Sequence, residues 1–163
     1  MESNDERGVV EYRITLEAYH DVSRLRKKGA KAQAKATAYE AKAKSAEAKA
    51  TKCTHMAVTL RRKAGEYMQK AKNLESMAQE MEKGLEGMDP IAANKQRVKI
   101  AKMRARAAKY MQRAKNLEAR AASYTERSVK YKERTAYFEN MAKKYQQEAD
   151  AYFSRADKLE KIT

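Results

Sequence analysis

Large and small side chains follow a seven-residue pattern through the second half of the chain. The large residues of this column are Met103, Tyr110, Leu117, Tyr124, Tyr131, Phe138, Tyr145, Tyr152 and Leu159. Four residues after successive large residues come small ones, namely Ala107, Ala114, Ala121, Ser128, Thr135, Ala142, Ala149 and Ala156. This spacing places both columns on one face of a helix, as in the d and a positions of a coiled coil.

The first half of the chain has the same form. Its d column contains Leu25, Tyr39, Cys53, Leu60, Tyr67, Leu74 and Met81, and its a column begins at Gly29 and is otherwise alanine up to Ala78. A nine-residue sequence, YMQKAKNLE from Tyr67, returns as YMQRAKNLE from Tyr110. Ala, Lys, Glu and Arg dominate the composition and there is a single proline, which is typical of long helices.

One short interior stretch contains the residues that end and begin helices. Gly84 and Gly87 can end a helix in the left-handed conformation. Asp89 followed by Pro90 is typical of an N-cap and the first helical position. We therefore predict a helix over residues 21–85, a turn over 86–89, a helix over 90–162 and one hairpin domain over 21–163.

Residues 1–20 give a less definite pattern, and we predict a polar tail followed by a short amphipathic segment. Val9, Tyr12, Leu16 and Tyr19 follow helical spacing, whereas Val10, Tyr12, Ile14 and Leu16 alternate as in a strand. We favour a helix that is broken near Asp21. Residues 1–8 are expected to be disordered.

The pairing of the two helices follows from the sizes of their side chains. A parallel homodimer would stack tyrosine on tyrosine and alanine on alanine, which close packing disfavours. An antiparallel fold about Gly87 instead places large residues opposite small ones: Tyr110 opposite Ala64, Leu117 opposite Ala57, Phe138 opposite Ala36 and Tyr145 opposite Gly29. The predicted fold class is all-α, a long antiparallel two-helix coiled-coil hairpin with an alanine-rich seam.

Basic residues occupy the g positions beside this seam in both helices. Nine of them line about 42 Å of one edge at 1.5 Å per residue, namely Lys42, Lys49, Lys63, Lys70, Arg106, Arg113, Arg120, Arg127 and Arg134. The predicted register makes like charges face each other, in the pairs Lys42–Arg134, Lys49–Arg127, Lys63–Arg113 and Lys70–Arg106. The e positions of the opposite edge pair Glu40 with Lys132 and Glu75 with Arg97, so that edge is close to neutral.

A one-sided row of cations has three interpretations, which the sequence leaves open. The row can be a solvated face whose long stems shield the seam. It can bind a polyanion such as nucleic acid, because neutralising phosphates releases counterions and arginine grips a phosphate with two donors. It can also dock an acidic protein. The formal net charge of +15 suits either anionic partner.

The remaining residues narrow the classes of function and the expected compartment. Cys53 is the only cysteine, so we expect no disulfide and a reducing compartment, the cytoplasm or nucleus. The polar start of the chain predicts no secretory signal, and no apolar run reaches the ~18 residues of a membrane span. With only His20 and His55 as histidines, we expect no catalytic site, metal or cofactor.

We therefore predict a non-enzymatic, rod-like structural protein that binds or coats a polyanion through the nine basic residues. We expect this polyanion to be nucleic acid, such as DNA, bound without sequence specificity. The alternatives are a self-assembling coiled-coil scaffold or filament protein and an adaptor for an acidic protein. Self-association as a homo-oligomer is expected from apolar residues outside the a and d columns: Met56, Met68, Met77, Met111, Val129, Tyr137, Met141 and Phe153.

Overall fold

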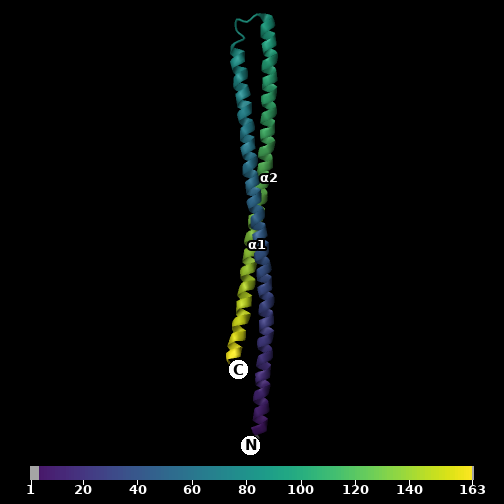
Figure 1. Ribbon diagram of the computed structural model, residues 1–163, viewed down its shortest axis with the longest axis vertical. Coiled ribbons are helices and arrows are strands. Elements are labelled where there is room, and N and C mark those ends of the chain that lie inside the picture. The colour runs from purple at the N-terminus through teal and green to yellow at the C-terminus, as the bar shows by residue number, and fades with distance from the viewer. Residues whose placement is uncertain (1–3, 163) are drawn as a thin grey trace. The chain divides into compact units, whose positions relative to one another are not determined.

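The computed structural model contains two helices, α1 (Asn4–Lys83) and α2 (Pro90–Ile162). It describes the backbone of residues 4–162 and the side chains of residues 19–162. The helices pack against each other and no strand is present in the described residues, so the predicted all-α helical hairpin is confirmed (Figure 1). Both helices are rich in residues with high helix propensity.

A six-residue turn joins the helices and uses the residues expected from the sequence. Gly87 adopts a positive φ of 83°, a conformation that glycine reaches without a steric penalty. The backbone N–H of Ala93 donates to the carbonyl of Asp89 at 2.8 Å, so Asp89 occupies the N-cap of α2. Pro90 follows at the first helical position, where its missing N–H costs nothing.

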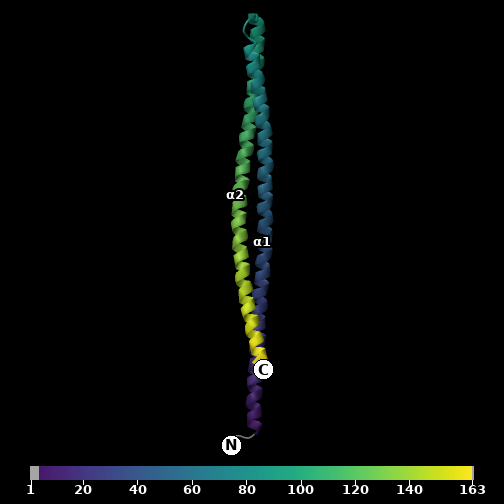
Figure 2. The same ribbon diagram turned by 90° about the vertical axis from the view of Figure 1, so that its left-hand side faces the viewer.

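The chain divides into two compact units, each a length of antiparallel helix pair. Unit 1 comprises residues 1–48 and 131–163, and unit 2 comprises residues 49–130. Within each unit the α1 and α2 segments run side by side in both ribbon views (Figures 1 and 2). The buried apolar residues are alanines apart from Val22, Leu60 and Ile100, so the core of each unit is a narrow alanine seam.

The register of the seam differs from the predicted one by one heptad. The ring of Phe153 lies against Gly29, where Tyr145 was expected. In unit 2 the hydroxyl of Ser128 donates to the carbonyl of Ala50 at 3.3 Å, although the predicted register placed Tyr124 opposite Ala50. A shift of seven residues preserves every heptad position, so large residues still face small ones. Leu60, for example, packs with Ala121.

Two features at the turn end of the seam favour the observed register. The predicted register would place the d-position residue Gln96 inside the seam, and the shift moves it beyond Lys83, the last residue of α1. The shift also brings Arg104 to Glu75 and Glu82, instead of the predicted contact between Glu75 and Arg97. The predicted register would place the amide of Gln96 in the seam, and burying an amide without a hydrogen-bond partner is costly. The observed register brings Arg104 to two carboxylates, and contacts between opposite charges help to fix a register.

The N-terminal segment differs from its prediction as well. α1 is continuous from Asn4 and passes through Asp21 without a break. In unit 1 it extends beyond the C-terminal end of α2 (Figure 1). Residues 1–3, part of the tail predicted to be disordered, lie outside the described residues.

Candidate nucleic-acid interface

All nine predicted basic residues have exposed side chains. Lys42 and Arg134 belong to unit 1, and the other seven belong to unit 2. Each occupies the g position that follows a d residue by three, so the helices themselves place the cations along one edge of the seam. The seven residues of unit 2, Lys49, Lys63, Lys70, Arg106, Arg113, Arg120 and Arg127, are hereafter called the basic edge.

Several of these cations lie over the ring of the aromatic d residue three positions earlier. The guanidinium of Arg127 is 5.2 Å from the ring centre of Tyr124, and that of Arg134 is 5.4 Å from Tyr131. In α1 the ammonium of Lys42 is 5.0 Å from the ring centre of Tyr39. Such contacts contribute about 0.5–1 kcal/mol each at exposed sites. The basic columns therefore also cover the half-buried tyrosines of the seam.

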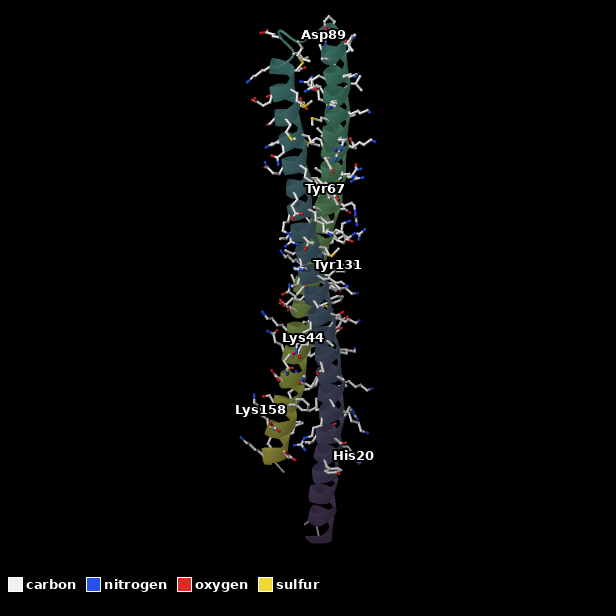
Figure 3. All side chains as sticks on the ribbon, turned by 45° about the horizontal axis from the view of Figure 1, so that its top comes forward. His20, Lys44, Tyr67, Asp89, Tyr131 and Lys158 are labelled. Atoms are coloured by element: carbon white, nitrogen blue, oxygen red, sulfur yellow. The ribbon has the colours of Figure 1, made fainter. Side chains whose placement is uncertain are left out.

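The most elaborate of these contacts lies in unit 2, around Tyr67 and Tyr110. Tyr67 lies between α1 and α2 (Figure 3), and its ring stacks on that of Tyr110 with the centres 5.8 Å apart. The ammonium of Lys70 is 5.4 Å from the ring centre of Tyr67 and 5.8 Å from that of Tyr110. The guanidinium of Arg113 is 5.9 Å from each ring centre.

This cluster corrects the predicted pairing of the cations. Lys70 shares its two rings with Arg113 and not with Arg106. The same register places Lys63 opposite Arg120. These two facing pairs are still of like charge, but their partners are displaced by one heptad, and Arg106 now faces Met77 in place of Lys70.

The electrostatic balance of the basic edge is positive. Within the described part of the chain, Lys63, Lys70, Arg106 and Arg113 form no ion pair with a carboxylate. The guanidinium of Arg113 lies over the two tyrosine rings and forms no ion pair in the described residues, so its N–H groups can still donate to a ligand. An arginine held in this way can bind a phosphate oxygen without leaving the ring.

The opposite edge of unit 2 contains ion pairs around Arg104. Arg104 donates from Nε to Glu75 Oε1 at 3.2 Å and from Nη2 to Glu82 Oε2 at 2.8 Å. The hydrogen bond from Arg104 lowers the pKa of the Glu82 carboxyl, and the same bond raises the pKa of the guanidinium. Arg61 donates to the hydroxyl of Thr125 at 3.0 Å. The asymmetry between the two edges, predicted in outline, is therefore present within unit 2.

The tyrosine contacts were missed in the sequence analysis, although the spacing that produces them was visible. Tyr-x-x-Arg and Tyr-x-x-Lys recur because the d and g positions are three residues apart, and residues at that spacing are neighbours on a helix. The sequence analysis placed the tyrosines in the seam and the cations beside it, and predicted no contact between a particular ring and a particular cation. The structure joins the two columns.

Two other kinds of site are absent from the described residues. No helix in the described part of the chain combines the length and the apolar character that a membrane span requires. Among the same residues, no cluster of His, Cys, Asp and Glu side chains is arranged to hold a metal ion. No protein-family model, curated protein or solved structure matches this chain.

Proposed function

We propose that this helical hairpin binds nucleic acid through the basic edge, by contacts to phosphates and without reading base sequence. The observation that carries the proposal is the exposure of Lys63, Lys70, Arg106 and Arg113, which form no ion pair with a carboxylate in the described residues. Two pairs of cations, Lys70–Arg113 and Lys63–Arg120, also face each other across the seam. Facing like charges cost a few tenths of a kcal/mol per pair. A bound polyanion would offset this repulsion, because its negative charges would lie next to the facing cations. Binding would also be favoured because each neutralised phosphate releases counterions.

The contact geometry supports phosphate binding in preference to base stacking. The aromatic rings of unit 2 that lie at the basic edge are half-buried and carry cations over their faces, as Tyr67, Tyr110 and Tyr124 do. A base would have to displace those cations before it could stack. Contacts to phosphates position a protein on nucleic acid but carry no direct sequence information. A partner of this kind would meet the chain in the cytoplasm or nucleus, the compartments predicted from its lone cysteine.

The test is a charge reversal on the basic edge. The triple variant Arg113→Glu, Arg120→Glu and Arg127→Glu should lose measurable binding to a 30-base-pair DNA duplex at 50 mM salt. For the unmodified chain, three phosphate contacts would contribute about 2.7 to the slope of log K against log salt. Fluorescence anisotropy measures both quantities, and circular dichroism verifies that the helix content is retained.

A matched control reverses three exposed cations elsewhere on unit 2. Arg62, Lys72 and Lys115 occupy f and b positions away from the basic edge, and changing them to Glu alters the net charge by the same amount. The control should bind more weakly but keep the salt slope of the unmodified chain. Equal loss in the two triple variants would show that net charge alone matters. If the unmodified chain does not bind at 50 mM salt, the proposal is wrong.

The second candidate is a self-assembling scaffold. Val58, Val129, Tyr137 and Met77 are at least half exposed, and exposed apolar residues favour association. Phe153, which the sequence analysis counted among such residues, instead packs on Gly29. Sedimentation of the nuclease-treated protein separates the two functions, because a scaffold forms large assemblies without nucleic acid and a binder gives a small, discrete species.

A further inference from the structure

The two copies of the nine-residue repeat lie against each other in unit 2. Tyr67, the first residue of one copy, stacks on Tyr110, the first residue of the other. Because the helices are antiparallel, a local two-fold axis relates the copies. The axis passes through the basic edge between the two rings, perpendicular to the helices.

The side-chain contacts around the two tyrosines follow this symmetry. Lys70 and Arg113 are equivalent positions, and each lies over both tyrosines at 5.4–5.9 Å. Within α1, Gln69 donates to Asn73 at 3.0 Å. Within α2, the equivalent Gln112 donates to Asn116 at 3.1 Å. The symmetry is therefore one of structure as well as of sequence.

Four cations of the basic edge are related by this axis. Lys70 and Arg113 form the inner pair, and Lys63 and Arg106 are equivalent positions that form the outer pair. All four are exposed. The symmetry does not include Arg120 and Arg127, because the position equivalent to Arg120 is Met77 and the position equivalent to Arg127 is Gly84 in the turn.

We infer that the ligand of this quartet is double-stranded nucleic acid, bound with one of its own two-fold axes along that of the cations. The inference rests on the proposed function. The antiparallel strands of a duplex are related by two-fold axes perpendicular to its length, whatever the base sequence, and symmetric proteins align with such axes. A single strand has a direction and no such axis, so its phosphates cannot meet both halves of the quartet equivalently.

Two comparisons test the inference. At 50 mM salt the full-length chain should bind a 30-base-pair DNA duplex at least about tenfold more tightly than a single strand with the same number of phosphates, because each lost phosphate contact costs about tenfold under these conditions. The variants Lys63→Ala and Arg106→Ala should weaken duplex binding by similar factors. Equal affinity for duplex and single strand would overturn the inference and leave the proposed function intact.

A gain-of-function variant extends the test. Met77→Lys supplies a cation at the position that the two-fold axis relates to Arg120, and it should steepen the salt slope for the duplex by about 0.9. Val58→Lys is its control, because Met77 and Val58 are 51% and 59% exposed and Val58 occupies a b position away from the basic edge. If both variants steepen the slope equally, the symmetric alignment is wrong. If no variant binds any nucleic acid, the proposed function fails too.

Discussion

The contact between Gly29 and Phe153 gives a quantitative test of the observed register. A Cβ atom built on Gly29 would lie 2.8 Å from Cε1 and 2.9 Å from Cζ of Phe153, closer than real carbon atoms approach. A Cβ built on Gly65, also within α1, meets nothing within 4 Å. Gly29 is therefore buried against a packed neighbour, whereas Gly65 is exposed and has none within 4 Å of such a Cβ.

The expected free energies of unfolding follow from two opposing effects. Replacing a helical glycine by alanine stabilises a helix by about 1 kcal/mol, so Gly65→Ala should stabilise the hairpin by that amount. In Gly29→Ala the same gain is opposed by overpacking against the ring of Phe153, which costs about 1–3 kcal/mol. We expect a net change between zero and a loss of about 2 kcal/mol.

Urea denaturation followed by circular dichroism at 222 nm measures both variants. In a chain of this size 1 kcal/mol shifts the melting temperature by roughly 2–4 °C, so thermal unfolding gives a second estimate. In the background Phe153→Ala the clash is removed, and Gly29→Ala should then stabilise by about 1 kcal/mol. Stabilisation by Gly29→Ala as large as that by Gly65→Ala would refute the register in unit 1.

Three further outcomes are expected in unit 2. Leu60→Ala should cost about 2–3 kcal/mol, the low end of the range for such substitutions, because a narrow seam can close over the lost volume; urea unfolding measures it. Ser128→Ala should cost about 0.5–1.5 kcal/mol by the same measurement, and a neutral effect would mean that its hydrogen bonds to Ala50 and Thr54 contribute nothing. Arg104 lowers the pKa of Glu82, so this contribution to stability is present above pH 4.5 and is lost as the pH falls below it. The melting temperature should therefore drop more between pH 6 and pH 3 for the unmodified chain than for Arg104→Gln, and identical pH profiles would contradict the ion pair.

The hairpin was predictable from sequence because two independent patterns agreed. Large d residues and small a residues required an antiparallel partner, and Gly87 marked where the chain could reverse. The register was not predictable to better than one heptad, because a pattern that repeats every seven residues is unchanged by a shift of seven. Only non-repeating residues, such as Gln96 and Glu82, distinguish the alternatives.

The exposure of the basic residues was predictable from the sequence, whereas their contacts were not. The exposure of the basic residues follows from their heptad position, which the sequence gives directly. The stacking of Tyr67 on Tyr110, and the placement of Lys70 and Arg113 over both rings, depend on which residues face each other across the seam. Those contacts could not be predicted without the register.

The alanine seam has a consequence for how this hairpin opens. Most of its layers bury little more than methyl groups, so each contributes a small increment and none dominates. The helices contact each other layer by layer, so we expect the pair to open progressively, as repeat proteins do. Amide hydrogen exchange should therefore be slowest in the helical segments next to the turn at residues 84–89. It should become faster with each heptad away from the turn.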